Sequence, residues 1–237
     1  MEKYEELLRG ALKIRQPDAK EGLRVNIDTI LLAHFVSPKK DEKILELGCA
    51  HGAISLILAK RGFAVKGIDI QPHLIELAKE NAAFNGISAE FETADLKEYK
   101  KIAAPQSFDR VVVNPPYFEA ASSSRVSPSS AVASARQGTD CSLEDVAAAS
   151  RYLLKNRGRL NIIMAAQRSA ELFALLENSS ISVKKVRFVY PKPRAEASVV
   201  LIEAVRAAKK GTSVLPPLFV LDADGKETEE MLENYSL

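Results

Sequence analysis

The chain has 237 residues, of which 46% are hydrophobic and 27% are charged, and its formal net charge at pH 7 is +2. That composition is typical of a globular protein with a sizeable core, and it excludes a wholly disordered chain. The first residues are charged and no stretch approaches the roughly 20 apolar residues that span a bilayer, so we expect one cytoplasmic α/β domain without a membrane segment.

The first half of the chain alternates short apolar runs with helical patterns. The run over 108–113 is rich in valine, as a central parallel strand requires. Pro72 opens a helix at a position where proline is tolerated. The expected elements are strands over 44–47, 64–69, 87–92 and 108–113, and helices over 53–61 and 72–84.

The second half continues this alternation. Ser142 offers a helix cap, and an acid, Asp145, follows three residues later. Residues 120–135 include seven serines and no acid, so we expect a mobile loop there. The expected elements are helices over 142–155 and 167–177, a strand over 159–164, and two β-rich runs over 181–190 and 197–205 that close the sheet.

The repeated alternation of strand and helix predicts a mostly parallel sheet with helices on both faces and right-handed crossovers. In such sheets, ligands bind outside the carboxyl ends of the strands. The turns that follow the predicted strands are therefore the places where functional residues are expected.

A turn with two glycines joins the first predicted strand to the first helix. It reads Glu46-Leu47-Gly48-Cys49-Ala50-His51-Gly52, and its small residues let the backbone approach a ligand closely. The glycine spacing departs from the three-glycine pattern that binds dinucleotides, and Glu46 adds a carboxylate. The turn therefore favours a cation-bearing ligand without phosphate, such as S-adenosylmethionine, with a bare tight turn as the alternative.

Two aspartates at the ends of the next two strands extend this predicted cofactor site. Asp69 is placed to accept hydrogen bonds from both ribose hydroxyls of an adenosine moiety, and the alternative is a helix N-cap ahead of Pro72. Asp95 is placed to accept from the adenine amino group, with a plain turn aspartate as the alternative. The neighbouring Ile70 and Leu96 belong to the same predicted site.

The most specific signal is Asn114-Pro115-Pro116-Tyr117, directly after the strand over 108–113. The prolines fix the backbone and leave carbonyls without competing amide donors. The Asn114 side-chain oxygen and the Pro115 carbonyl can then converge on one NH₂ group and stabilise the positive charge that develops when this weak nucleophile accepts a methyl group. Tyr117 is expected to stack on a planar substrate. The motif predicts methylation of an exocyclic amino nitrogen.

The sequence gives no sign of a disulfide or a metal centre. Cys49 and Cys141 lie far apart, and the three histidines show no metal-ligand spacing with them. We therefore expect neither. Cys49 and His51, inside the glycine-containing turn, are expected to be packing and solvent residues.

Charge is distributed unevenly along the second half. Eight basic residues lie between Lys184 and Lys210 against two acids, whereas six acids and one lysine lie from Asp222 to the end. The basic run suits a polyanionic partner, and two solvated faces are the alternative.

These motifs resemble the amino-methyltransferase branch of the Rossmann-like S-adenosylmethionine-dependent methyltransferases. Further segments extend the likeness over nearly the whole chain to the bacterial tRNA1(Val) adenine-N6 methyltransferase family, which modifies the adenine 3′ of the anticodon. These segments are residues 24–32, 135–136, 189–191, 215–220, 224–225 and 229–231. One departure is Ala50, where the family often has glycine.

The resemblance implies a seven-stranded, mostly parallel sheet in a single domain over 1–237, with a helical N-terminal lid segment over 1–40 ahead of a catalytic core over 41–237. It also implies S-adenosylmethionine as the cofactor and a tRNA as the partner. Asp28 would then belong to the cofactor site, with an N-cap for the following helix as an equal alternative. The candidate RNA contacts are Arg24, Arg136, Lys184, Lys185, Arg187, Lys192 and Arg194.

Other activities share parts of this pattern. Methyltransferases that act on a release-factor glutamine use Asn-Pro-Pro-Tyr because a carboxamide poses the same chemical problem, but they carry a separate N-terminal helical domain. DNA adenine methyltransferases need an added recognition region, for which the residues between Phe118 and Gly138 are too few. A non-catalytic RNA-binding module has no use for a paired acceptor site, and a dehydrogenase lacks its glycine fingerprint here.

Overall fold

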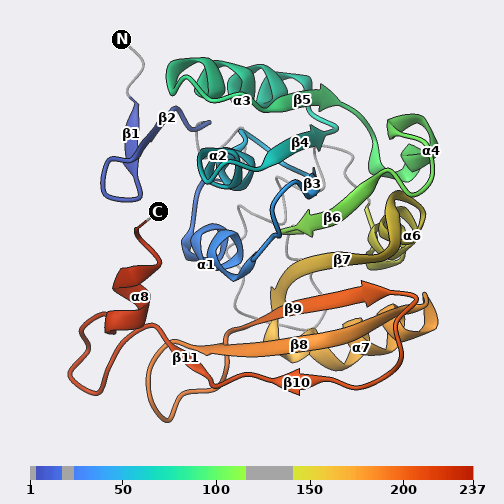
Figure 1. Ribbon diagram of the computed structural model, residues 1–237. Helices are drawn as coiled ribbons and strands as arrows, with labels where there is room; N and C mark the ends of the chain where they lie inside the picture. Colours follow the sequence, from blue (N-terminus) through green and yellow to red (C-terminus); the bar gives the residue numbers. More distant parts are fainter. Residues whose placement is uncertain (1–3, 18–23, 116–140, 237) are drawn as a thin grey trace.

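The computed structural model describes residues 4–17, 24–115 and 141–236, and Figure 1 shows them arranged around one large twisted sheet. The strand order is β10-β8-β9-β7-β6-β3-β4-β5, and β11 also pairs with β8. The strands are β3 (Lys43–Leu47), β4 (Ala64–Asp69), β5 (Glu90–Thr93), β6 (Phe108–Val113), β7 (Leu154–Ala165), β8 (Ile181–Tyr190), β9 (Val199–Arg206), β10 (Ser213–Val214) and β11 (Leu218–Phe219).

Helices cover both faces of this sheet (Figure 1). One face packs against α1, α2, α3 and α8, and the other against α4, α6 and α7. The helices are α1 (Ile27–Phe35), α2 (Ala53–Lys60), α3 (Pro72–Phe84), α4 (Tyr99–Ile102), α6 (Leu143–Leu153), α7 (Ser169–Asn178) and α8 (Glu229–Glu233). None of the helices in the described ranges is long and apolar enough to cross a membrane.

The alternation of side chains along β6 explains why there are two cores. Val112 joins the hydrophobic cluster beneath α1 and α2, whereas Val111 and Val113 join the cluster beneath α6. Because successive side chains of a strand point to opposite faces, a strand buried on both sides must be apolar throughout, as the valine run is. The predicted α/β fold with helices on both faces is confirmed.

The start of α6 forms as the sequence predicts. The Ser142 hydroxyl accepts from the Asp145 backbone N–H at 3.1 Å, and the Asp145 carboxylate accepts from the Ser142 backbone N–H at 2.9 Å. This reciprocal pair satisfies two backbone donors that the helix itself leaves unpaired.

The order of strands creates a switch point between β3 and β6. The chain moves from β3 outward to β4 and β5, then returns to pair β6 with the other side of β3, all in parallel. Leu47 at the end of β3 lies opposite Val113 at the end of β6. Ligands bind at such switch points, outside the carboxyl ends of the strands.

A buried polar network centred on Arg110 runs across β6, β7 and β9. The Arg110 guanidinium, 1% exposed, donates to Glu42 at 2.9 Å, to Asn161 at 2.5 Å and to Glu203 at 3.2 Å. Burial favours the neutral form of Glu203, but Arg159, Lys185 and Arg110 together hold its pKa below the usual value. The network therefore joins β6, β7 and β9 through paired charges.

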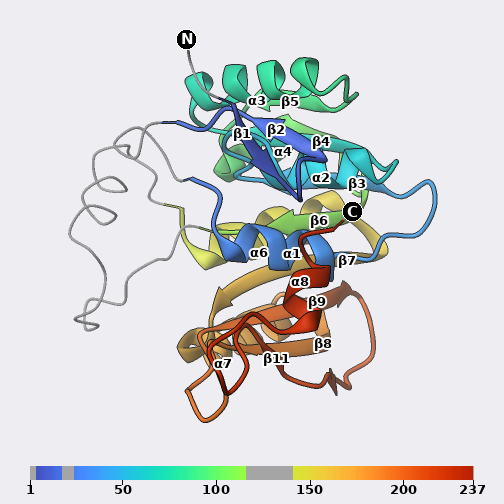
Figure 2. The same cartoon turned by 90° about the vertical axis from the view of Figure 1, so that its left-hand side faces the viewer.

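Two features differ from the sequence prediction. The sheet has nine strands among the described residues rather than seven, because β10 and β11 add two short parallel pairings along the outer edge of β8. The predicted helical N-terminal segment contains an antiparallel hairpin, β1 (Glu5–Leu7) and β2 (Leu12–Ile14), before its single helix α1. Figures 1 and 2 show this hairpin beside α2 and α3.

Candidate active site

The turn between β3 and α2 directs its backbone donors inward. The N–H groups of Gly48 and Cys49 both donate to the Ile68 carbonyl at 2.9 Å, and the Ala50 N–H donates to Asp69 at 2.9 Å. The Gly52 N–H donates to the Cys49 carbonyl at 2.8 Å. These four donors are therefore engaged within the protein, so the turn does not offer them as a cradle for phosphate.

The two glycines of this turn have different roles. Both have positive φ angles, +72° at Gly48 and +86° at Gly52. A Cβ atom on Gly52 would lie 2.9 Å from the Phe91 ring, whereas one on Gly48 would meet nothing within 4 Å. Gly52 is therefore needed for packing, and Gly48 faces open space at the switch point, where a ligand can approach the backbone.

Ala50 also has a positive φ angle, +47°. Alanine adopts this left-handed conformation at an energetic cost of about 1 kcal/mol, whereas a glycine at this position would adopt it without that cost. The surrounding hydrogen bonds hold Ala50 in the conformation nevertheless.

Glu46 is buried directly behind the turn. Its side chain is 2% exposed, and its carboxylate accepts from the Ser55 hydroxyl of α2 at 2.5 Å. Burial raises its pKa to about 8, with a smaller contribution from the nearby Asp69 and against the opposing effect of the Ser55 hydrogen bonds. A carboxyl in this state gains from a cationic ligand, which would favour its ionised form.

Asp69 ends β4 beside the same turn. One carboxylate oxygen accepts from Ala50 N–H at 2.9 Å and the other from Gln71 N–H at 3.0 Å. Burial raises the pKa of Asp69, while these hydrogen bonds oppose the rise. Gln71, not Asp69, occupies the N-cap of α3, so the helix-cap alternative is wrong. Each oxygen keeps acceptor capacity for a ligand hydroxyl.

Asn114 follows β6 at the switch point, and it is half-buried, while Pro115 is buried. The β3–β6 pairing places the end of β6 beside the end of β3, where Gly48 begins its turn. Pro116 and Tyr117 lie outside the described residues, as do Arg136 and the serine-rich segment 120–135. The structure thus brings the first residue of the Asn-Pro-Pro-Tyr motif to the predicted cofactor turn.

The remaining predicted cofactor residues occupy varied positions. Asp28 is 5% exposed in the first turn of α1, and burial raises its pKa to about 6. Its N-cap alternative is wrong, because the Asn26 side chain caps α1 by accepting from Thr29 N–H at 3.1 Å. The Asp95 carboxylate accepts from the Lys97 N–H at 2.8 Å, as expected if Asp95 is a turn aspartate, which was the alternative to a cofactor contact. Ile70 is 40% exposed.

Cys49 and His51 of the turn are both buried, as packing residues are. Burial lowers the pKa of His51 to about 4, so its ring stays neutral at physiological pH. Cys49 and Cys141 are both free thiols. The described residues hold no group of three or more side chains that could bind a metal ion.

The predicted RNA contacts separate into two groups. Because β8 is antiparallel to β9, and β9 to β7, the carboxyl end of β8 lies at the same edge of the sheet as Asn114. Lys192 and Arg194 follow that end and are exposed. Lys184 and Lys185 lie in the amino-terminal half of β8, where Lys184 donates to the carbonyls of 209 and 211 and Lys185 pairs with Glu203.

Two predicted arginine contacts are engaged elsewhere. Arg24 forms an ion pair with Glu5 of the hairpin. Arg187 pairs with Glu230 of α8 at 2.5 Å and donates to the Pro216 carbonyl at 3.0 Å. Their charges are therefore partly neutralised within the protein.

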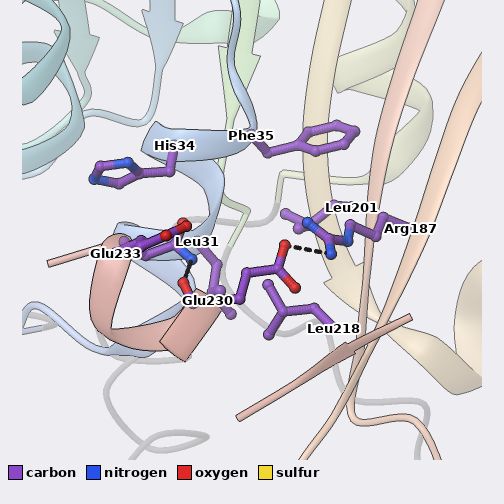
Figure 3. Close-up of a pocket in the computed structure, with 9 residues that line it drawn as sticks. Leu31, His34, Phe35, Arg187, Leu201, Leu218, Glu230 and Glu233 are labelled. Carbon is purple, nitrogen blue, oxygen red and sulfur yellow. Dashed lines mark hydrogen bonds and ion pairs between the residues drawn. The ribbon is translucent and has the colours of Figure 1, made fainter. Parts of the chain in front are cut away.

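A pocket of about 230 Å³ lies between α1, α8 and the sheet (Figure 3). The Arg187–Glu230 pair crosses it, and Leu31, Leu201 and Leu218 form apolar walls. No residue of the Gly48 turn lines this pocket. The Arg187–Glu230 pair joins α8 to the sheet. The pocket does not belong to the candidate active site.

Sequence reasoning missed Ser55 as the partner of Glu46. The signal was a single polar residue inside the otherwise apolar start of α2. Ser55 is fully buried, and its hydroxyl donates a hydrogen bond to the buried Glu46 carboxyl. Buried polar groups require such partners.

Comparisons with known proteins agree with this geometry. A family model described as a methyltransferase domain matches residues 38–187. A tRNA1(Val) (adenine(37)-N6)-methyltransferase from Parabacteroides distasonis is 30% identical over 83% of this chain and 83% of its own length. A release factor glutamine methyltransferase from Agrobacterium fabrum is 42% identical over 39% of this chain and 33% of its own length.

Among solved structures, a protein described as a predicted O-methyltransferase from Agrobacterium tumefaciens has the same fold. It superposes with a TM-score of 0.69 at 20% identity, over 88% of this chain and 96% of that one. This likeness shows the fold, and the match to the methyltransferase domain over residues 38–187 shows the family. The chain belongs to the methyltransferase-domain family and has the Rossmann-like fold of S-adenosylmethionine-dependent methyltransferases.

Proposed function

We propose that this protein methylates an exocyclic amino nitrogen, namely N6 of an adenine beside the anticodon of a tRNA. The observation that carries the proposal is the position of Asn114, directly after β6 and next to the strand that leads into the Gly48 turn. Neighbouring strands lie about 4.8 Å apart, so the turn and the acceptor side chain start from adjacent backbones. A side-chain amide oxygen is a suitable acceptor for an NH₂ group.

S-adenosylmethionine supplies a methyl group activated by a positively charged sulfur. Glu46 is proposed to stabilise the positive charge at the amino-acid end, and Asp69 to accept from the ribose hydroxyls. The exposed Ile70 side chain offers an apolar surface for the adenine. The other residues proposed to surround the cofactor are Asp28, Gly48, Cys49, Ala50, Gly52, Asp95, Leu96 and Asn114.

The chemistry assigned to Asn114 is the stabilisation of developing charge. Its side-chain oxygen and the Pro115 carbonyl accept hydrogen bonds from the substrate amino group, which favours a pyramidal nitrogen. As the nitrogen forms its bond to the methyl carbon, the bond from that carbon to the sulfonium sulfur would break, and its electron pair would stay on the sulfur of the departing thioether. The nitrogen would then be positively charged until it loses a proton to water, and the same two acceptors would stabilise that charge. Pro116 is proposed to keep the backbone fixed, and Tyr117 to stack on the extruded base.

The tRNA assignment is supported by similarity to a tRNA adenine-N6 methyltransferase along most of the chain and by the basic residues at the site edge. Its direct test is mass spectrometry of nucleosides from bulk tRNA incubated with the protein and isotopically labelled S-adenosylmethionine. We expect labelled N6-methyladenosine in one tRNA. Label in another base, or none in RNA, would contradict the assignment.

A second candidate, methylation of a release-factor glutamine, is favoured by the 42% identity to a glutamine methyltransferase over part of the chain. The chemistry at Asn114 would be unchanged, because a carboxamide NH₂ needs the same two acceptors. The same labelled cofactor incubated with release factors distinguishes the two. Label on the protein and none on tRNA would select this candidate.

Lys192 and Arg194 are expected to contact RNA phosphates. Replacing either with alanine should weaken tRNA binding and lower the slope of log affinity against log salt by about one unit, because one fewer counterion is released. Lys184→Ala and Lys185→Ala are matched controls in the same strand-turn unit, and their slopes should change little. Filter binding between low and high salt provides the measurement. A larger loss in the controls would show that the RNA lies along the body of β8.

The raised pKa of Glu46 predicts a pH-dependent cofactor affinity. With a pKa of about 8, the carboxyl is mostly protonated at pH 7 in the free protein, and a cationic ligand favours its ionised form. Affinity should therefore rise between pH 6 and 8, by up to about tenfold per pH unit, and binding at pH 7 should release a proton. Calorimetry in buffers with different ionisation enthalpies measures this release.

Glu46→Gln is the control for this pH dependence. Burial raises the pKa of Glu46 in the folded protein to about 8, whereas in the unfolded chain the carboxyl has its ordinary pKa of 4.5. The unfolded chain therefore ionises first, and the free energy of unfolding falls as pH rises from about 4.5 toward about 8. The variant should therefore be more stable than the parent at pH 8, yet bind the cofactor more weakly and without proton release. Proton release that persists in the variant would assign it to another group.

A further inference from the structure

Asn81 of α3 is a fully buried amide that contacts two segments far from it in the chain. Its side-chain oxygen accepts from the Arg15 N–H at 2.7 Å, and its amide nitrogen donates to the carbonyls of Arg15 at 2.9 Å and His51 at 3.1 Å. Both amide hydrogens are therefore used. A flipped amide would point its hydrogens at the Arg15 N–H, so the contacts fix its orientation.

The contacts to Arg15 belong to the docking of the N-terminal hairpin. One helical turn later, Asn85 holds Lys13 in the same manner, accepting from its N–H at 2.9 Å and donating to its carbonyl at 2.7 Å. The Asn81 and Asn85 side chains thus donate to and accept from the backbone of β2 and of the residue after it, as a neighbouring strand would. The described hydrogen bonds of the Asn85 side chain go to Lys13 and to the Asn81 carbonyl, whereas the Asn81 side chain also holds the turn through His51.

Hydrogen bonds also join the hairpin to the segment that precedes α1. The Gln16 side chain accepts from the Val25 N–H at 2.8 Å and donates to Glu5 at 2.8 Å. The hairpin, the Gly48 turn and the segment that precedes α1 are thus joined by hydrogen bonds, and Asn81 connects the hairpin to the turn.

We infer that Asn81 is a positioning residue that couples docking of the N-terminal hairpin to the shape of the cofactor turn. Undocking would remove both Arg15 partners that fix the orientation of the Asn81 amide. The amide could then rotate away from His51 toward water. Docking, in turn, fixes the His51 carbonyl between the two glycines and so holds the turn with Gly48 facing open space. The inference rests on the cofactor site proposed at this turn and concerns the cofactor rather than the methyl acceptor.

The test compares Asn81→Ala with Asn85→Ala, since each variant loses one pair of hydrogen bonds to the hairpin but only the first loses a contact with the turn. The buried Leu12 and Ile14 should keep the hairpin docked in both. We expect Asn81→Ala to raise the Kd and KM for S-adenosylmethionine by about tenfold, with little change in kcat at saturating cofactor. Asn85→Ala should change them by less than about twofold. Equal changes in the two variants would overturn the inference.

Hydrogen exchange in the parent protein provides a second measurement that needs no variant. Because coupling is reciprocal, saturating S-adenosylmethionine should raise the protection of the Arg15 N–H. The Leu215 N–H, which donates to Val186 at the opposite edge of the sheet, is the internal control and should gain less. Equal gains at both amides would overturn the inference.

Asp69→Ala separates failure of the coupling from failure of the site. If Asp69→Ala loses cofactor affinity while Asn81→Ala keeps it, the site stands and the coupling is wrong. If Asp69→Ala binds S-adenosylmethionine normally, the site and the inference are overturned together. Kd is measured with the cofactor alone, so this comparison does not depend on whether the methyl acceptor is RNA.

Discussion

Replacing Asn114 with alanine is expected to lower turnover by about a hundredfold or more, while folding and cofactor affinity stay close to those of the parent. The lost oxygen acts chiefly on charge that appears only in the transition state, so rate and binding should separate. Asn114 is half-buried at the end of β6, and its removal leaves the apolar core beneath untouched. Single-turnover kinetics on the unmethylated form of the identified substrate, with cofactor affinity measured in parallel, tests this expectation.

A matched control for Asn114→Ala is Asn234→Ala, which removes an amide from the end of α8, away from the turn. It should leave turnover unchanged. Near-parental turnover in Asn114→Ala would contradict the amino-methylation mechanism even if the fold and the cofactor are as described. A parallel loss of cofactor affinity would instead make Asn114 chiefly a binding residue.

Arg110→Met is expected to lower the free energy of unfolding by about 3 to 5 kcal/mol, the range seen when one partner of a buried charge pair is removed. The methionine fills much of the space of the arginine but donates no hydrogen bond. Glu203 and Asn161 therefore lose the Arg110 donor, which lies 3.2 Å and 2.5 Å from them in the parent. Glu203 keeps its contacts with Arg159 and Lys185, which limits the loss. Urea denaturation monitored by circular dichroism measures the change.

Lys155→Met is the control for Arg110→Met. Lys155 pairs with Asp109, the residue before Arg110, but its side chain is 44% exposed. A pair this open to solvent contributes about 1 kcal/mol or less. If the two variants lose similar stability, the buried network is not what holds β6 against β7 and β9.

The elements with strong periodicity were predictable from the sequence. The strand over 108–113 has the expected bounds, because a run buried on both faces admits few alternatives. The strand over 181–190 also has the expected bounds, although it is only partly buried. The β1–β2 hairpin was missed because each strand has three residues, too few for a period of two to stand out. Its burial comes from contacts with distant helices that the local pattern does not contain.

The candidate site was predictable where its residues are contiguous. Glu46 to Gly52 and Asn114 to Pro115 are local motifs, and the parallel β3–β6 pairing brings them together. Asn81, by contrast, acts through Arg15, 66 positions away, and nothing in its own neighbourhood indicates that contact. The basic run was visible, but only the direction of β8 shows that Lys192 and Arg194 share an edge with Asn114 while Lys184 does not.

The β3–β6 ladder also has an evolutionary consequence. The spacing between cofactor turn and acceptor group is set by main-chain hydrogen bonds, which do not depend on side-chain identity. The residues proposed to contact the RNA, Lys192 and Arg194, lie on the separate turn after β8. A lineage can therefore exchange that turn and acquire a new macromolecular target while inheriting its chemistry unaltered, so reaction type should diverge more slowly than substrate among descendants of one such ancestor.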